Sequence, residues 1–232
     1  SRVYPIKTMS QLKFVENKTR FKLCDKQEVS GTSERGISEA FPLEGVRSLY
    51  GATKLCSEYI IQEYCEMYKI RGVINRCGVL TGPWQMGKVD QGVVSLWVAK
   101  HIYGGTLNYV GYGGQGKQVR DILAIDDLYD LLVKQMENLD LHNGQIYNVG
   151  GGVEVSTSLM ELTHICEKVT GNKIKIDSIE ENRVADIPYY ITDTTKVKNI
   201  TGWFPKNNVH QIVEDIAQWI QQNKQQLQVI MS

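Results

Sequence analysis

The sequence of 232 residues has no excess of charge of either sign, because 26 lysines and arginines are balanced by 26 aspartates and glutamates. A chain that binds nucleic acid through its charge needs a basic surplus, so this balance disfavours that class of partner. The sequence also has no apolar run that approaches the roughly 18 residues of a membrane helix. We therefore expect neither a nucleic-acid partner nor a membrane span.

Cysteine is scarce, and its spacing fits neither a disulfide framework nor a zinc site. The five cysteines form an odd set without a CxxC pair: Cys24, Cys56, Cys65, Cys77 and Cys166. Disulfide scaffolds use even sets, and zinc sites use closely spaced pairs. The pattern predicts reduced thiols, no metal site and a cytoplasmic protein.

A glycine-rich loop that follows a strand and opens a helix is also missing. The cluster GYGGQG at 111–116 is followed by VRDILAI, which has the pattern of a strand, and the glycines at 150–152 are followed by Val153-Glu154-Val155. A dinucleotide fingerprint needs a helix at that point. We therefore interpret 111–116 as a hairpin or a substrate-facing loop.

Strand and helix patterns alternate through most of the chain. We expect strands at 72–80, 107–112, 119–125, 144–151 and 174–177, and helices at 48–68, 92–103, 126–139, 156–171 and 208–227. Asp126 and Ser156 are predicted to start two of these helices, and residues 5–47 to form a long loop. The alternation predicts an α/β fold with a largely parallel sheet and helical cover.

Tyr50 and Lys54 are the first candidates for chemistry. They are four residues apart on a predicted helix and therefore share a face. An ammonium group beside a phenol stabilises the phenolate, and such a tyrosine can exchange a proton with a substrate hydroxyl. The spacing alone leaves open that the two are unrelated residues on a surface helix.

Three motifs, in this order, resemble the extended branch of the short-chain dehydrogenase/reductase superfamily, the nucleotide-sugar epimerases and dehydratases. They are SLYGATKLCSEYI with the strand GVINRCGVLTGP, then GKQVRDILAIDDL, then ENRVADIPYYITDTTKVKNITGWFP. Within the branch, the Asp90-Gln91-Gly92 segment and its surroundings are most similar to CDP-paratose 2-epimerases. One departure is Ala124, where the family usually has a histidine.

The resemblance implies a Rossmann-like parallel sheet, of which only the C-terminal part is present, and a smaller α/β substrate-binding domain. Residues 1–80 would belong to the NAD-binding Rossmann domain, and 81–232 mainly to the nucleotide-sugar-binding domain. Residues 119–150 would return to the Rossmann domain. We expect the sequence to be truncated at its N-terminus, with the phosphate loop and a catalytic Ser or Thr upstream of Ser1.

The resemblance further implies an NAD-dependent epimerase that acts on a nucleotide sugar, with a CDP-sugar favoured, and that forms a homodimer. Tyr50 and Lys54 would be catalytic and would also bind NAD, and the Cys77 main chain would adjoin the nicotinamide. The implied substrate-binding residues are Gln91, Asn108, Tyr109, Val110, Arg120, Arg183 and Asp186. Among these, the two arginines would hold the diphosphate, Asp186 a ribose hydroxyl, and 108–110 would border the nucleobase.

Three alternatives stay open. A UDP-sugar 4-epimerase is disfavoured because many such enzymes have asparagine at the position of Val79. A 4,6-dehydratase is disfavoured because Ser1-Arg2 stands where an Asp-Glu pair is common. A catalytically incomplete fragment that only binds a ligand is suggested by the missing glycine loop, since a cofactor pyrophosphate would lose its helix N-terminus.

Overall fold

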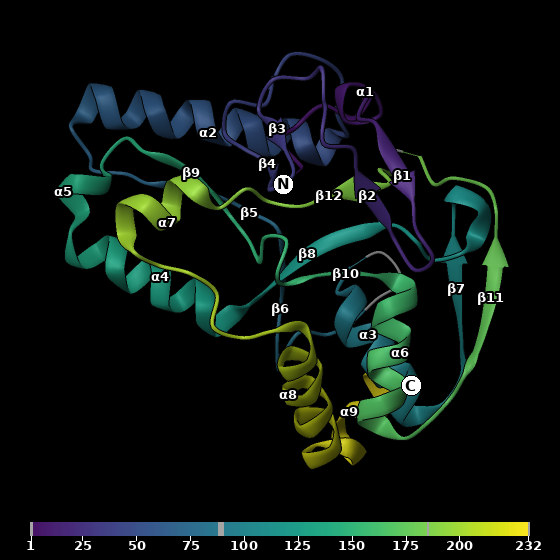
Figure 1. The fold of residues 1–232 in the computed structure, drawn as a ribbon. Helices are drawn as coiled ribbons and strands as arrows, with labels where there is room; N and C mark the ends of the chain where they lie inside the picture. The colour runs from purple at the N-terminus through teal and green to yellow at the C-terminus, as the bar shows by residue number, and fades with distance from the viewer. Residues whose placement is uncertain (1, 88–90, 185, 232) are drawn as a thin grey trace.

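The computed structural model describes residues 2–87, 91–184 and 186–231 (Figure 1). The predictions for Ser1 and Asp90 therefore lie outside the described residues. None of the described helices is long and apolar enough to cross a membrane.

Parallel strand pairs form the centre of the molecule. Strand β5 (Ile74–Cys77) pairs with β9 (Ile146–Val149), and β6 (Val79–Thr81) pairs with β8 (Val119–Ala124). Strand β8 also pairs with β12 (Tyr189–Tyr190) in parallel and with β10 (Ser156–Ser158) in antiparallel orientation. A further parallel pair, β7 (Thr106–Val110) and β11 (Lys175–Ile179), lies at one side (Figure 1). The predicted α/β architecture with mainly parallel pairing is confirmed.

The strand expected at 72–80 is two strands, because the chain is interrupted at Gly78. A Cβ atom at this position would lie 3.1 Å from both carboxylate oxygens of Asp121 and 3.2 Å from the Thr192 hydroxyl. Asp121 is completely buried, so the glycine lets the backbone pass close to a carboxylate inside the protein. The chain thus passes from Cys77, which pairs with Val149 of β9, to Val79, which pairs with Ile122 of β8.

A cluster of helices packs below the strands in Figure 1: α3 (Val93–Tyr103), α6 (Leu159–Thr170), α8 (Val209–Gln222) and α9 (Lys224–Met231). The predicted apolar face of the C-terminal helix is confirmed, since Ile212, Ile216 and Ile220 are all buried. The single helix expected at 208–227 is wrong, because it is interrupted at Asn223. The Asn223 side chain donates to the Trp219 carbonyl at 2.9 Å and ends α8 there.

Two predicted helix starts are displaced. Asp126 lies within the first turn of α4 (Ile125–Glu137), where a carboxylate favours the helix dipole, and Ala124 occupies the N-cap. Ser158, two residues after the predicted Ser156, caps α6 in a capping box with Glu161. The predicted end of α6 at Gly171 is confirmed, with a left-handed φ of 72°.

The long loop predicted at 5–47 contains more structure than its polar sequence indicates. It holds α1 (Ile6–Met9), the hairpin β1 (Phe14–Glu16) and β2 (Phe21–Leu23), and the hairpin β3 (Thr32–Ser33) and β4 (Gly36–Ile37). Phe21, Leu23, Ile37 and Phe41 are buried in one cluster with β12. This segment is therefore ordered by contacts with residues that are distant in the sequence, and local sequence patterns do not reveal such contacts.

Helix α2 (Leu49–Tyr68) forms where the sequence predicts it, with the Ser48 hydroxyl accepting from the Gly51 amide at 3.1 Å. Most of its apolar side chains, Tyr59 and Ile60 among them, are exposed, and it buries only Gly51, Leu55 and Glu58. Two more helices, α5 (Leu139–His142) and α7 (Thr195–Thr201), lie with α4 near β9. Leu131 of α4, Tyr147 of β9 and Val197 of α7 are buried in one cluster there. A short 3-10 turn, η1 (Tyr112–Gly114), follows β7.

Candidate functional site

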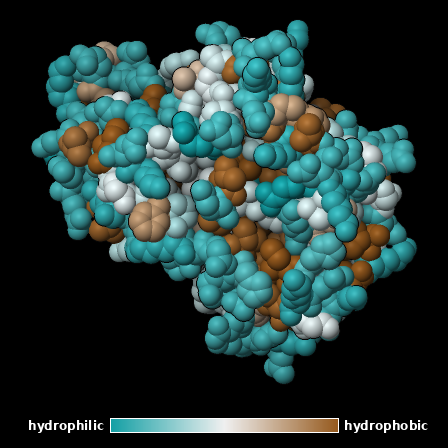
Figure 2. Space-filling view, viewed as in Figure 1, coloured by the Kyte–Doolittle hydropathy of each residue, from teal (hydrophilic) through white to brown (hydrophobic). Residues whose placement is uncertain are grey.

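Two cavities share three lining residues, Arg2, Val79 and Arg120. The larger has a volume of about 550 Å³ and is lined by α2, β5 and the start of β6; we call it the α2 cavity. The smaller, of about 300 Å³, is lined by α3, β7, β8 and the β10–α6 junction; we call it the α3 cavity. Figure 2 shows hydrophobic residues gathered near the centre of the face on which β8, α3 and α6 lie in Figure 1.

Tyr50 and Lys54 both line the α2 cavity. The Lys54 ammonium nitrogen lies 5.3 Å from the centroid of the Tyr50 ring, within the range of a cation–π contact. The Tyr50 side chain is 60% exposed, so its hydroxyl is accessible to a ligand in the cavity. The structure therefore brings a phenol and an ammonium group together on one side of α2.

Strand β5 lines the α2 cavity along its whole length, and at its carboxyl end Cys77 is in register with Val149 of β9. Ligands of open parallel α/β sheets bind at this edge. Burial raises the pKa of the Cys77 thiol to about 11, which keeps it protonated at neutral pH. The Cys77 thiol is therefore a poor nucleophile, and the position of its main chain beside a nicotinamide stays a prediction.

A buried polar network beside Tyr50 was not predicted as a unit. Two nitrogens of Arg76 donate to the Glu58 carboxylate, at 2.7 and 3.0 Å, and both residues line the α2 cavity. Arg76 also donates to the Tyr4 hydroxyl, which in turn donates to Asn148 at 2.7 Å. Burial lowers the pKa of Arg76, but Glu58 and Tyr4 outweigh it and the pKa rises. This network ties α2 to β5 and β9.

No sequence signal identified Glu58 as the partner of Arg76. Glu58 lies four residues after Lys54, so the helical period places both on one side of α2. The period does not show which strand that side contacts.

The α3 cavity gathers six of the seven predicted substrate-binding residues: Gln91, Asn108, Val110, Arg120, Arg183 and Asp186. The seventh, Tyr109, is not among the described residues that line it. The Tyr109 hydroxyl donates to Thr163 on α6 at 2.8 Å. Successive side chains of a strand point to opposite faces, so Asn108 and Val110 share one face of β7 and Tyr109 takes the other.

Arg120, in the second motif, donates to residues in the first part of the third motif. Its Nη2 donates to the Asp186 carboxylate at 3.0 Å and to the Ile187 carbonyl at 2.6 Å. Burial lowers the pKa of Arg120 while the Asp186 charge opposes that change, and an arginine stays charged in either case. The neighbouring carboxylate, Asp121, accepts from the Gly152 amide at 3.3 Å. Two residues assigned to the substrate from separate motifs are thus in direct contact.

The α3 cavity also has lining residues that were not predicted, among them Trp97, Thr157 and Gln118. Trp97 and Thr157 are buried in its wall, and Gln118 donates to the Val110 carbonyl at 2.6 Å. Gln118 stands next to Val119-Arg120 in the second motif, which was the available signal, whereas Trp97 and Thr157 carried none. Within the described ranges, no group of three or more His, Cys, Asp or Glu residues could hold a metal ion.

Comparison with known proteins identifies the family. Residues 6–216 match the family model described as GDP-mannose 4,6 dehydratase, and the chain belongs to this family of nucleotide-sugar epimerases and dehydratases. It is 27% identical over 213 residues to CDP-paratose 2-epimerase of Salmonella typhi, covering 91% of this chain and 60% of that protein. It is 26% identical over 219 residues to a probable UDP-glucuronate 4-epimerase of Rhizobium meliloti, covering 87% and 62%.

Solved structures confirm the Rossmann-like fold. Pal from Bacillus thuringiensis superimposes with a TM-score of 0.70 and 28% identity, over 81% of this chain and 57% of that one. UDP-glucuronic acid 4-epimerase from Bacillus cereus, solved with UDP-glucuronic acid and NAD, gives 0.70 and 22% over 85% and 60%. The chain thus spans about 60% of the length of the relatives it matches. The predicted resemblance to the extended branch is confirmed.

Proposed function

We propose that the chain is part of an NAD-dependent epimerase that inverts one carbon of a nucleotide-activated sugar through a keto intermediate, with a CDP-sugar as the favoured substrate. The observation that carries this proposal is the shared wall of the two cavities. A nucleotide sugar has an anionic diphosphate between a base and a sugar, and Arg120 lies where the two cavities meet. A guanidinium group suits a diphosphate at that point.

The α3 cavity would bind the nucleotide half. Asn108 and Val110 would border the base, with Tyr109 contributing its main chain alone. Arg120 and Arg183 would hold the diphosphate, and Asp186 would accept from a ribose hydroxyl. Gln91, exposed at the entrance to α3, would contact the substrate beside them.

The α2 cavity would bind the sugar and the nicotinamide end of NAD. Its residues fit that group, because Cys77 and Gly78 line the cavity at the strand end, Val79 offers an apolar surface, and Lys54 can donate to ribose hydroxyls. Bound NAD would supply reversible hydride transfer at the sugar carbon. Tyr50 would accept the proton of the sugar hydroxyl and later return it, and the Lys54 charge would stabilise the phenolate between these steps.

The assignment of residues to domains and the homodimer also belong to the proposal. Pairing of β9 with β5 supports a Rossmann role for 119–150, and pairing of β7 with β11 supports a separate substrate-binding part within 81–232. Exposed apolar residues on α2 support burial of that helix against a further surface.

The test uses the longest natural polypeptide that carries these residues, incubated with NAD and with CDP-paratose, UDP-glucose, dTDP-glucose or GDP-mannose. We expect a CDP-sugar to be converted to an isomer of unchanged mass, and the conversion is followed by NMR. Loss of water from any substrate would indicate a dehydratase, and an isomer from UDP-glucose alone would indicate a 4-epimerase. Binding without any turnover would leave the non-catalytic alternative.

A further inference from the structure

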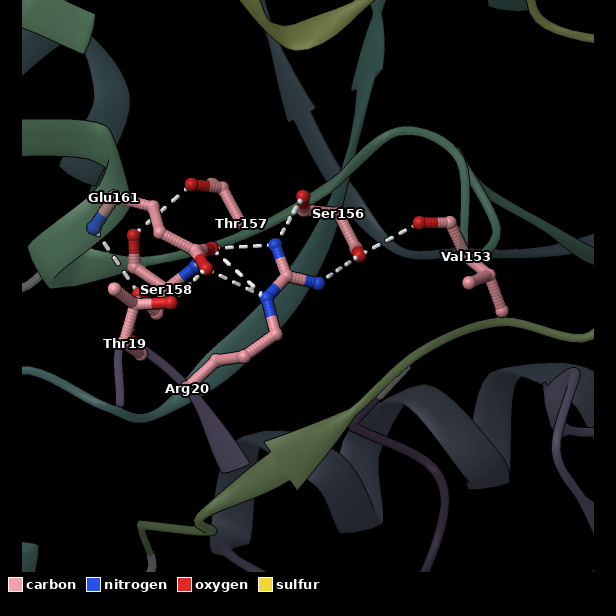
Figure 3. Close-up of polar contacts among 7 residues, drawn as sticks. All are labelled: Thr19, Arg20, Val153, Ser156, Thr157, Ser158 and Glu161. Atoms are coloured by element: carbon pink, nitrogen blue, oxygen red, sulfur yellow. Dashed lines mark hydrogen bonds and ion pairs between the residues drawn. The ribbon is translucent and has the colours of Figure 1, made fainter. Parts of the chain in front are cut away.

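The turn of the β1–β2 hairpin contacts the junction of β10 and α6, although the two are about 140 residues apart in the sequence (Figure 3). Arg20 Nε donates to the two carboxylate oxygens of Glu161 at 2.8 and 2.9 Å, and Arg20 Nη2 also contacts this carboxylate. The Thr19 hydroxyl donates to Glu161 Oε1 at 2.6 Å. This fork geometry fixes the relative orientation of the two segments.

The same arginine also holds strand β10. Arg20 Nη1 donates to the Ser156 hydroxyl and Nη2 to the Ser156 carbonyl, each at 3.0 Å. The Ser158 hydroxyl donates back to the Thr19 carbonyl at 2.7 Å. We call this set, Thr19, Arg20, Ser156, Ser158 and Glu161, the hairpin clasp. Figure 3 shows that all three guanidinium nitrogens of Arg20 are directed at β10 and α6.

The hairpin clasp adjoins the α3 cavity, and one of its residues, Ser158, lines that cavity. Thr157, between two clasp residues, lines that cavity and is the cross-strand partner of Arg120. Glu161 completes the capping box of α6, and Leu159 and Leu162 of that helix form part of the cavity wall. The clasp therefore holds the strand that faces Arg120 and the helix beside it.

We propose that Arg20 is a positioning residue for the nucleotide, acting through Thr157 and Arg120. The inference rests on the proposed function, because it takes the α3 cavity to be the nucleotide site. Small displacements of a binding group lower affinity or rate steeply. Among the described residues that line the α2 cavity, none belongs to the clasp, so loss of Arg20 weakens nucleotide binding and leaves proton transfer at Tyr50 intact.

The test compares CDP binding by isothermal titration calorimetry in the natural polypeptide and its variants. Arg20→Met is expected to raise the Kd for CDP about tenfold, with kcat at saturating substrate within about twofold of the wild type. Arg20→Lys should bind CDP as weakly as Arg20→Met, because an ammonium cannot form the two-pronged contact with the carboxylate. Arg35→Met is the matched control, since Arg35 pairs with Asp193 and lines neither cavity among the residues described.

Glu161→Gln separates positioning from helix stability. Glutamine can still complete a capping box, so α6 should persist while the charge of the pair is lost. We expect a smaller rise in Kd than for Arg20→Met. We also expect the double variant to have the same Kd for CDP as Arg20→Met alone, because both changes remove the same interaction.

Each outcome decides between the two proposals. If Arg20→Met lowers the melting temperature and keeps the wild-type Kd, the clasp is structural only and the inference fails while the epimerase proposal stands. If the wild type turns over no nucleotide sugar and the Kd pattern holds, the epimerase proposal fails and the positioning role stands. A wild type that binds neither CDP nor UDP overturns both.

Discussion

Helix α8 is strongly amphipathic and helix α2 only weakly so, and their apolar side chains differ in what they contact. Helix α8 buries Ile212, Ile216 and Ile220 against α3 and α6. Helix α2 is longer, and it leaves Tyr59 and Ile60 exposed. The hydrophobic period predicts which residues share a face, but it does not predict which partner, or whether any in the same chain, covers that face.

This difference coincides with the division of the candidate site. The α3 cavity, proposed for the nucleotide, is built on the closed core that contains α8. The α2 cavity, proposed for the chemistry, lies on a helix whose main buried attachment is polar, the Glu58–Arg76 pair. The predictions below test whether binding and chemistry divide in this way.

The largest expected effect is on the chemistry. Tyr50→Phe removes the proton-exchanging hydroxyl, and we expect kcat to fall about 1,000-fold, with KM for the nucleotide sugar little changed. Tyr59→Phe, on an exposed part of the same helix, should leave both constants unchanged. Equal losses in the two variants would show that the hydroxyl of Tyr50 has no special role.

The next largest effect concerns the attachment of α2. Glu58→Ala leaves the Arg76 guanidinium buried, with a side-chain exposure of 4%, and should cost about 4 kcal/mol in the free energy of unfolding. Glu66→Ala on the same helix removes an exposed pair with Lys69 and should cost less than about 0.5 kcal/mol. Urea denaturation measures both. Similar costs would mean that α2 is not held by the buried pair.

The stability costs of truncating a buried and an exposed isoleucine should differ somewhat less. Ile216→Ala empties a fully buried position on α8 and should destabilise by about 3 kcal/mol. Ile60→Ala on α2 removes an exposed side chain and should change stability by about 0.5 kcal/mol or less. A large cost at Ile60 in the isolated chain would contradict the exposed placement of that face.

The smallest effect is the pH dependence of the hairpin clasp. Burial raises the pKa of Glu161, but Arg20, Thr19 and the Ser158 amide outweigh it, so the pKa falls below its ordinary value. The resulting stabilisation is complete above the unfolded pKa of glutamate, about 4.3, and is lost as the pH falls through the lower folded value.

Thermal melts of wild type and Glu161→Gln should therefore differ most near neutral pH and converge in acid. The exposed variant Glu66→Gln is the control. A difference that grows on acidification would reverse the sign of the argument.

Local patterns were sufficient for the helix at α2, the buried face of α8 and the spacing of Tyr50 and Lys54. They were insufficient where a distant partner decides the structure. The polar segment 5–47 is ordered by burial of Phe21 and Ile37 against β12, and the strand at 72–80 divides because Gly78 passes the buried Asp121.

The site shows the same limit. The motifs predicted six side chains that line one cavity, whereas the Arg120–Asp186 contact and the Glu58–Arg76 pair join segments that only the fold brings together. Tyr109 fits a motif position, but the alternation of β7 turns its side chain toward α6.

The most direct test of the central claim is a crystal structure of the CDP complex of the natural polypeptide. Our account predicts the cytosine beside Asn108 and Val110 and the diphosphate at Arg120, with its terminal phosphate directed toward the α2 cavity. A nucleotide bound elsewhere, or one whose diphosphate points away from Tyr50, would contradict it.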